Sequence, residues 1–438
     1  MRVLFINSVC GVGSTGRICT DLAQQLEAEG NEVKIAYGRK GTVPEQFEKY
    51  AVRIGTDLDC KIHALQTRLF DTHGFGSKHA TKKFLEWAEN YNPDLLWLHN
   101  IHGYYINVEM LFDWIKKNPE MQVKWTLHDC WAFTGHCTHF TVAKCEQWKK
   151  QCTHCSQLHQ YPACFGRGSV RKNFERKESV FTGVKNMTLI TPSKWLANLT
   201  RESFLKEYPV EVHYNTIDTS IFQPTASDFR ERNCLQDKMI VLGVANVWEG
   251  RKGLLDFYKL AQMLDSKYAI VLVGLNEKQI RNLPQNIRGL QKNICSQEVA
   301  VSYTVTELTA KTYAEKTLDV ELSKFHAYEK KEDKNCTQFT TQSDNVVISQ
   351  NVNALYKAIT GDIYDCNNRK KLGGCRIVCI PRTNSPKELA AIYTAADVFA
   401  NPTYEDNYPT VNLEAQACGT RVVTYDTGGC RETVGMQI

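Results

Sequence analysis

The stretch NPTYEDNYPTVNLEAQACGTRVVTYDTGGCRET, residues 401–433, decides the fold. An apolar run ends where the stretch begins, and its first residues carry turn chemistry. From residue 410 apolar side chains recur with helical spacing, and Gly419 is placed as a C-terminal stop. A short buried-type strand over 421–425 and a glycine loop follow. The stretch therefore predicts one strand–helix–strand unit of a parallel sheet, a kind of sheet that binds ligands outside the C-terminal ends of its strands.

Two acidic residues eight positions apart flank the start of the predicted helix. Asp406 lies in the turn before the helix, and Glu414 lies one turn inside it. The N–H groups of a first helical turn have no partner within the helix, so they can hold a phosphate. A carboxylate on each side would then bind hydroxyl groups, which matches the ribose and the hexose of a nucleotide-diphosphate sugar. Alternatively, Asp406 only caps the helix and Glu414 is solvated.

The stretch resembles the donor-binding signature of the retaining glycosyltransferases of family four, group 1, which have the GT-B fold. In that family two acids precede an Ala-x-Ala-Cys-Gly-like helix, a strand and a Gly-Gly loop. The resemblance implies that Glu414 holds the ribose of the donor and that Asp406 contacts its hexose. Because the first acid is usually a glutamate, Glu405 is an alternative for the second role, although the spacing favours Asp406. Three neighbouring residues are further donor-binding candidates: Asn407, Tyr408 and Thr410.

A cationic loop follows the first predicted strand of the second domain, residues 239–243. A departing diphosphate needs positive charge that is already positioned. The family uses an arginine and a lysine in this loop; Lys252 matches the lysine, while Asn246 stands near the usual arginine, so we assign the second charge to Arg251. The resemblance implies that Arg251, Lys252 and Asp406 act in catalysis without a catalytic metal. A merely solvated loop is the alternative.

The N-terminal half opens with a strand over 3–6, a glycine-rich turn, a helix over 18–29 and a strand over 31–36, which is a βαβ unit. A glycine loop at a helix N-terminus can hold an anion. Its spacing differs from Gly-x-Gly-x-x-Gly, which disfavours a dinucleotide-binding fold. In the resembling family this loop borders the donor phosphates, so three residues are candidates: Gly13, Ser14 and Arg17. The alternative is a tight turn with a solvated arginine.

Two buried-type strands, 93–99 and 123–128, each end in a histidine. The carboxyl ends of parallel strands form the ligand-binding rim, so we expect His99 and His128 there. A structural role is the alternative for either one. In the resembling family a histidine at the position of His128 faces the donor sugar, so the resemblance implies that His128 is a catalytic residue together with Arg251, Lys252 and Asp406. His99 and His102 would then face the acceptor or shape the cleft.

A cysteine-rich loop spans residues 130–165. Four clustered thiols suggest a tetrahedral structural zinc, and the four predicted ligands are Cys137, Cys145, Cys152 and Cys155. The final Cys-x-x-Cys spacing is typical of zinc sites, whereas the first two spacings are not. The alternatives are free thiols packed against Trp131 and Trp148, and a redox pair of Cys152 with Cys155.

Bulk properties narrow the class of protein. The formal net charge of +5 disfavours a nucleic-acid binder and suits an anionic donor or a membrane-surface acceptor. No apolar run approaches the roughly 20 residues of a membrane span, and the first residues predict a strand in place of a signal peptide. The 17 cysteines are scattered along the chain, which fits a reducing cytosol. We therefore expect a cytoplasmic protein, with peripheral association at the inner face of the membrane as an option.

The resemblance implies two doubly wound, Rossmann-like α/β domains that face a cleft, which is the GT-B fold. Residues 214–218 are similar to the family's inter-domain connector. We therefore expect an acceptor-side domain over 1–215 and a nucleotide-sugar-binding domain over 216–438. Residues 290–378 break the pattern and are interpreted as an insertion. Relatives continue with further C-terminal helices, which we expect this domain to lack.

The function that the resemblance implies is transfer of a sugar, with retention, from a nucleotide-diphosphate sugar to a saccharide or lipid-linked acceptor. In a bacterium the product would belong to capsule, exopolysaccharide or lipopolysaccharide. The leaving phosphate oxygen would itself take the acceptor proton. Two alternatives are a nucleotide-sugar 2-epimerase on the same fold and a non-catalytic protein that binds nucleotide sugars.

Overall fold

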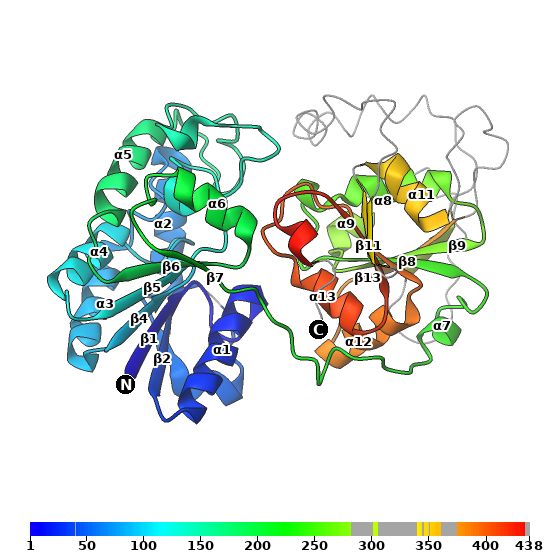
Figure 1. The fold of residues 1–438 in the computed structure, drawn as a ribbon, viewed down its shortest axis with the longest axis horizontal. Helices are drawn as coiled ribbons and strands as arrows, with labels where there is room; N and C mark the ends of the chain where they lie inside the picture. The colour runs from blue at the N-terminus through cyan, green and yellow to red at the C-terminus, as the bar shows by residue number, and fades with distance from the viewer. Residues whose placement is uncertain are drawn as a thin grey trace. The chain divides into compact units, whose positions relative to one another are not determined.

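The computed structural model describes residues 1–39, 41–281, 301–304, 340–343, 346–349, 351–360 and 375–433. The chain divides into two compact units, Met1–Asn215 and Thr216–Ile438 (Figure 1). Each unit is an α/β domain built on one sheet.

The described part of the N-terminal domain contains seven strands: β1 (Arg2–Asn7), β2 (Glu32–Tyr37), β3 (Ala51–Arg53), β4 (Leu95–Leu98), β5 (Gln122–Thr126), β6 (Met187–Thr191) and β7 (Val210–Val212). They form a sheet in the order β3-β2-β1-β4-β5-β6-β7, and every neighbouring pair is parallel. The chain starts in the middle, runs to one edge and returns to build the other half. β4 is a fully buried Leu-Leu-Trp-Leu run, as expected for a parallel strand covered on both faces.

Helices cover both faces of this sheet. They are α1 (Gly13–Ala28), α2 (Asp57–Phe70), α3 (Lys78–Tyr91), α4 (Val108–Lys117), α5 (Val170–Phe181) and α6 (Lys194–Glu202), with 3₁₀ turns η1 (Glu45–Tyr50), η2 (Trp131–Phe133) and η3 (Gln147–Lys149). α1 and η1 share one apolar cluster with β1, and α3, α4 and α5 share another. The Ser193 hydroxyl caps α6, because it accepts a hydrogen bond from the N–H of Leu196 at 3.1 Å.

The C-terminal domain has eight described strands: β8 (Met239–Val244), β9 (Tyr268–Val273), β10 (Val301–Thr304), β11 (Thr340–Ser343), β12 (Val346–Ser349), β13 (Arg376–Ile380), β14 (Val398–Asn401) and β15 (Arg421–Tyr425). Their order is β10-β13-β9-β8-β14-β15-β12-β11. The inner pairs are parallel, and the two edge strands, β10 and β11, pair antiparallel with their neighbours.

The described helices of this domain are α7 (Phe229–Arg232), α8 (Leu254–Met263), α9 (Glu277–Arg281), α11 (Val352–Thr360), α12 (Pro386–Ala395) and α13 (Thr410–Ala417), with 3₁₀ turns η4 (Gly250–Lys252) and η6 (Cys430–Thr433). In Figure 1, α8 and α11 lie on one face of the sheet and α12 and α13 on the other. Separate apolar clusters fill the two faces. Both domains are therefore doubly wound.

The stretch over 401–433 folds as predicted. β14 leads through a loop into α13, and β15 follows the helix in parallel with β14. Gly419 follows the C-cap residue Cys418 and has a φ of +80°, a left-handed conformation that glycine adopts without strain. The strand–helix–strand unit at the centre of our prediction is confirmed.

Several described elements with sheet or core contacts lie wholly or partly within the predicted insertion over 290–378. β12 pairs in parallel with β15, and α11 packs against α8 with Leu355 and Ile359 in the core. β13 also begins before the predicted insertion ends and pairs with β9. In the chain, β12 and α11 come between β9 and β13. In the sheet, β12 lies beside β15. The rest of the predicted insertion lies largely outside the described residues.

Candidate active site

The loop before α13 and the loop after β8 meet at an ion pair. The Nζ atom of Lys252 lies 2.5 Å from Oδ2 of Asp406, and the two side chains are 21% and 17% exposed. The other carboxylate oxygen of Asp406 accepts a hydrogen bond from the N–H of Asn407 at 2.9 Å. The structure thus brings together Lys252, the predicted catalytic cation, and Asp406, the predicted donor-contacting acid, from separate loops.

Two glycines allow the loops to approach this closely. Gly253 has a φ of +72°, and a Cβ there would lie 2.1 Å from the carbonyl oxygen of Pro402. Gly428, in the Gly-Gly loop, has a φ of +55°, and a Cβ would lie 1.9 Å from the carbonyl oxygen of Asp406. Gly429 donates its N–H to the same oxygen at 3.2 Å. The backbone on both sides of Asp406 is therefore fixed by contacts that only glycine permits.

Arg251 is part of the same loop contact. Its guanidinium donates to the carbonyl oxygen of Glu405 at 3.1 Å and pairs with Glu249 at 3.2 Å. Its own carbonyl oxygen accepts the N–H of Tyr404 at 2.7 Å. Arg251 thus holds the loop over 402–406, while Lys252 is the cation that reaches the Asp406 carboxylate.

Glu414 is buried on the inner side of α13, so the alternative of a solvated glutamate is wrong. Its Oε2 atom accepts a hydrogen bond from the hydroxyl of Tyr393, on α12, at 3.0 Å. Sequence reasoning missed Tyr393, because a partner 21 positions away leaves no trace in a periodic pattern. It also missed Asn412, which is fully buried and bonds both Asn401 and Thr433.

The three remaining donor-binding candidates surround the start of α13. Asn407 and Tyr408 are buried, and Thr410 is the first residue of the helix. The N-cap residue is Pro409, so the alternative in which Asp406 caps the helix is wrong. Proline has no polar side-chain group, and it makes no capping bond to the first-turn N–H groups.

Gly13, Ser14 and Arg17 lie on the exposed first turn of α1. The helix begins at Gly13 and not at residue 18, because the glycine-rich segment is itself helical after a left-handed Gly13 with a φ of +67°. These residues belong to the N-terminal unit, so their approach to a donor stays a prediction.

The histidines at the ends of β4 and β5 form a stacked pair. Nδ1 of His99 lies 3.0 Å from Nε2 of His128, and the rings stack with centroids 5.2 Å apart. His99 is buried, so it supports His128 from below the rim. Burial lowers the pKa of His128 to about 4, against a smaller opposing effect of Asp129. His128 is therefore a neutral imidazole at pH 7.

A second histidine and an aspartate lie beside this pair. Nε2 of His102 lies 3.0 Å from Oδ2 of Asp129. Burial alone would raise the pKa of Asp129, but His102 lowers it to about 2. Asp129 is thus a permanent negative charge at the C-terminal end of β5.

The predicted zinc site is wrong. Among the described residues, which include all four cysteines, no group of three or more His, Cys, Asp or Glu side chains is arranged to hold a metal ion. The physical reason is packing: Cys137 and Cys152 are buried in the same apolar cluster as Trp131 and Trp148, and Cys145 and Cys155 pack against that cluster. The structure matches the alternative of free thiols packed against the two tryptophans.

A buried lysine, missed by sequence reasoning, holds this loop. Nζ of Lys177, on α5, donates to the carbonyl oxygens of Trp131 at 2.7 Å and Thr134 at 2.9 Å and lies 3.7 Å above the Trp131 ring. Burial lowers the pKa of Lys177 to about 7.

Comparisons with known proteins agree with this architecture. The family model "Glycosyl transferases group 1" matches residues 367–438, which include β13 to β15 and α13. A protein of Escherichia coli K12 named as a colanic acid biosynthesis glycosyl transferase, WcaC, is 27% identical over 170 residues, which are 37% of this chain and 41% of that protein. The chain therefore matches less than half the length of this relative.

Two solved structures extend the likeness to both domains. Sucrose-phosphate synthase from Thermosynechococcus elongatus has a TM-score of 0.56 at 15% identity, covering 99% of this chain and 83% of that one. Anabaena HepE, solved in complex with UDP and glucose, has a TM-score of 0.50 at 12% identity, covering 100% and 84%. The fold is GT-B. The predicted fold class is confirmed.

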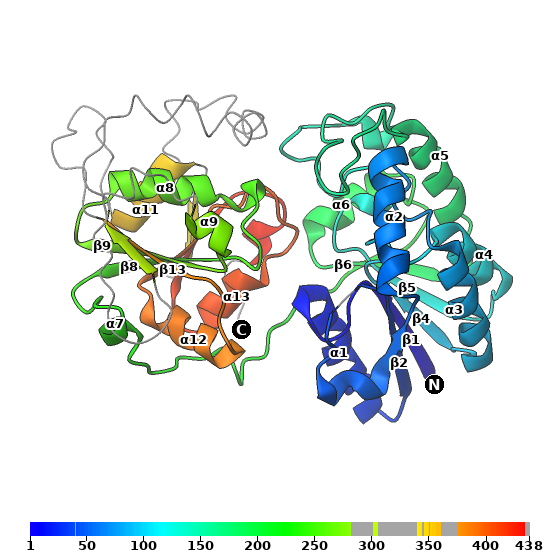
Figure 2. The same ribbon diagram turned by 180° about the vertical axis from the view of Figure 1, so that it is seen from behind.

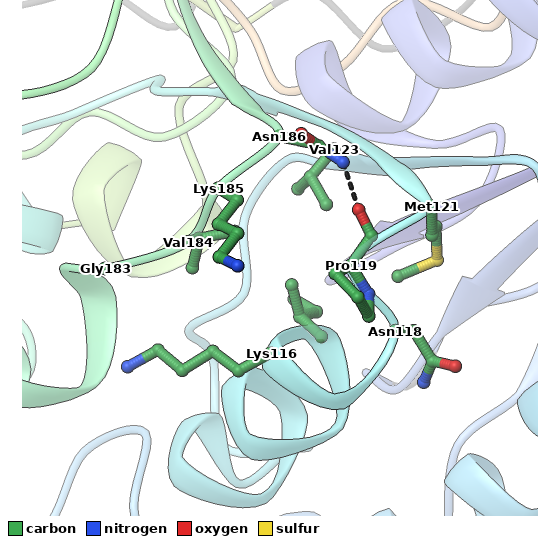
Figure 3. A pocket seen from close by; sticks show the side chains of 10 residues that line it. Lys116, Asn118, Pro119, Met121, Val123, Gly183, Val184, Lys185 and Asn186 are labelled. Carbon is green, nitrogen blue, oxygen red and sulfur yellow. Dashed lines mark hydrogen bonds between the residues drawn. The ribbon is translucent and has the colours of Figure 1, made fainter.

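One cavity of the GT-B N-terminal domain lies away from these residues. It has a volume of about 130 Å³ and lies between the end of α4 and the turn before β6 (Figure 3). Lys116, Lys185 and Met121 are among its lining residues, and Asn186 donates to the carbonyl oxygen of Pro119 at its rim. The cavity is at the N-terminal ends of β5 and β6, the edge opposite to the histidines.

Among the described residues, no helix combines the length and the apolar character that crossing a membrane requires.

Proposed function

We propose that this chain is a glycosyltransferase that moves a sugar from a nucleotide-diphosphate sugar to an acceptor hydroxyl, with retention of the anomeric configuration. One observation carries the proposal. Lys252 pairs with Asp406 in the loop before α13, and Asp406, the helix N-terminus and the buried Glu414 all lie inside the segment that matches the group 1 model.

The donor role of the C-terminal site follows from its charges. A diphosphate at the first turn of α13 would meet the positive end of the helix dipole and the Lys252 ammonium. Glu414, held by Tyr393, would bind the ribose, and Asp406 the hexose. A GT-B neighbour solved with UDP and glucose supports a UDP-sugar as the first donor to test.

The chemical step needs few groups. The bond between the anomeric carbon and the diphosphate oxygen breaks, and the acceptor oxygen forms the new bond on the same face. The acceptor proton passes to the leaving phosphate oxygen. Lys252, Arg251 and the α13 N-terminus stabilise the charge that develops on the diphosphate, so the step requires no catalytic metal.

The N-terminal domain would bind the acceptor, with His128 facing the donor sugar and Gly13, Ser14 and Arg17 near the phosphates. The acceptor is a saccharide or a lipid-linked saccharide in capsule, exopolysaccharide or lipopolysaccharide synthesis, and the name of the WcaC relative, colanic acid biosynthesis, supports a role in polysaccharide synthesis. Such synthesis would place the protein in the cytoplasm, at the inner face of the membrane where the acceptor is lipid-linked.

A panel of UDP-, GDP- and ADP-sugars tests the proposal. A ligand at 100 times its dissociation constant adds roughly 2.7 kcal/mol to the stability of the folded state, so thermal shift will detect the donor. Glu414→Ala is expected to weaken donor binding by about ten- to hundredfold, because a hydroxyl bound to a charged carboxylate contributes about 1.5–3 kcal/mol. Asp237→Ala, which removes an exposed acid of the same domain, is the matched control.

The outcomes separate the candidates. Transfer to an acceptor, with product NMR showing the donor's anomeric configuration, supports the proposal. Conversion of the donor without any acceptor would indicate an epimerase. Equal donor affinity of Glu414→Ala and the parent would refute the assigned site.

A further inference from the structure

One helix of the N-terminal domain presents an apolar face to solvent. Leu58, Ile62, Leu65 and Leu69 are 65%, 48%, 57% and 51% exposed. Their spacing of four, three and four residues places them on one side of α2, whose opposite side is buried through His63 and Thr67. Figure 2 shows α2 at the front of the N-terminal domain. A stripe of this length on a solvent-facing helix is unusual for a surface that touches only water.

The stripe continues onto the cysteine-rich loop. Phe70 at the end of α2 is 63% exposed and Phe165 in the loop is 69% exposed. The loop is fixed to the helix because the N–H of Phe165 donates to the carbonyl oxygen of Arg68 at 2.8 Å, and the Ser169 hydroxyl donates to that of Phe70 at 3.1 Å. We call this surface the α2 face; its apolar members are Leu58, Ile62, Leu65, Leu69, Phe70 and Phe165.

The charges that flank the apolar side chains of the α2 face are mainly positive. Lys61, Arg68 and Arg167 are exposed beside the apolar side chains. The two acids of α2 are engaged at its first turn: Asp57 pairs with Arg53 at 2.6 Å, and Asp59 accepts from Thr56 in a capping box. Residues 147–174 contain five lysines and arginines and no acid, and two of these cations pair with acids just outside the segment, Lys149 with Glu146 and Arg171 with Glu175.

We propose that the α2 face docks on an anionic bilayer surface. A helix with exposed leucines between cations lies in the interface plane, with its apolar side chains at the headgroup–acyl boundary and its cations on lipid phosphates. A second copy of this chain is a poorer occupant. In a two-fold dimer the α2 face would bring its cations against the same cations of the partner, which is repulsive.

The α2 face borders the candidate acceptor residues. The ring of Tyr161, in the same loop as Phe165, lies 5.5 Å from that of His73 and 6.2 Å from that of His102, centroid to centroid. His102 in turn pairs with Asp129. A lipid-anchored acceptor would therefore reach these residues from the docked surface. This last step rests on the proposed function, whereas docking itself needs no donor and no transfer.

Vesicle sedimentation tests the docking. The full chain is mixed with vesicles of phosphatidylglycerol and phosphatidylethanolamine, and separately with phosphatidylcholine vesicles. We expect binding to the anionic vesicles alone, weakened by salt. Leu65→Gln combined with Leu69→Gln should lower the lipid affinity by at least tenfold, and Lys61→Glu combined with Arg167→Glu should remove the preference for anionic lipid.

Met239→Gln is the matched control, since Met239 is 45% exposed and lies in the other domain; it should bind as the parent does. Circular dichroism confirms that each variant is folded. The proposal is overturned if the parent sediments with neither vesicle, or if the double leucine variant binds like the parent. A dimer that the same leucine changes convert to a monomer, without vesicle binding, would assign the α2 face to a second copy. Loss of transfer with intact vesicle binding would refute only the proposed function.

Discussion

Lys252 and Asp406 come from loops 154 positions apart, yet their side-chain atoms meet at 2.5 Å. Each charge holds the other in place at the start of α13. A ligand phosphate would therefore meet an ammonium group whose position is already fixed. Such preorganised charge stabilises the transition state most effectively.

Lys252→Ala should lower kcat by about a hundred- to a thousandfold, because it removes the positioned charge from the departing diphosphate. Steady-state kinetics with the donor identified by the thermal-shift panel measures this. Lys267→Ala, an exposed lysine in the turn before β9, serves as the control. A kcat within twofold of the parent would remove Lys252 from the catalytic group.

His63 makes the N-terminal domain acid-sensitive. It is fully buried, its Nε2 atom accepts the N–H groups of Gly74 and Gly76 at 3.2 Å, and burial lowers its pKa to about 4. Between pH 6.5 and pH 4 the unfolded chain binds a proton here that the folded chain does not. The free energy of unfolding should therefore fall as the pH falls through this window, by up to about 3 kcal/mol from this group.

Urea unfolding at pH 4.5, 5.5 and 6.5 checks this expectation. The slope with pH should be smaller in His63→Gln than in the parent, with the rest coming from other buried histidines such as His128, and it should be unchanged in His79→Gln, which changes an exposed histidine. Equal slopes in the parent and in His63→Gln would contradict the assignment.

At the scale of elements, the Gly-Gly loop after β15 sets the position of the loop before α13. Gly428→Ala should lower donor affinity, because its Cβ would lie 1.9 Å from the Asp406 carbonyl oxygen and displace that backbone. Gly30→Ala is the control, since Gly30 also has a positive φ, +85°, but a Cβ there has no atom within 4 Å. Calorimetric titration compares the two, and equal donor affinities would show that the close approach is unimportant.

Helices and strands were easier to predict from the sequence than contacts between residues that are distant in the chain. Apolar spacing and the glycine stop placed α13 and β15 nearly to the residue, because those signals act over a few neighbouring positions. The hydrogen bond from Tyr393 to Glu414 and those from Lys177 to the cysteine-rich loop join distant segments and left no local signal. The zinc prediction failed for the same reason: spacing showed four cysteines near one another in the chain, but packing with Trp131 and Trp148 decides where their side chains go.

At the scale of the whole molecule, the chain consists of two units with separate cores. A donor that binds the C-terminal unit should slow amide exchange in the loops over 249–253 and 402–410 much more than in β4 or α2. Hydrogen exchange with and without the nucleotide sugar at saturation measures this difference. Protection confined to the N-terminal unit would place the donor site there instead.

The position of β12 in the sheet has a consequence for synthesis of the chain. β12 ends at Ser349 and pairs with β15, which ends only at Tyr425. At about 5–20 residues per second the ribosome needs roughly 4–15 s to deliver that partner. Until β15 has been made, the backbone N–H and C=O groups on one side of β12 have no strand to pair with. An unpaired strand edge of this kind can pair with other chains and aggregate. Overproduction at low temperature, where other chains meet the edge less often, should therefore favour material that stays in solution.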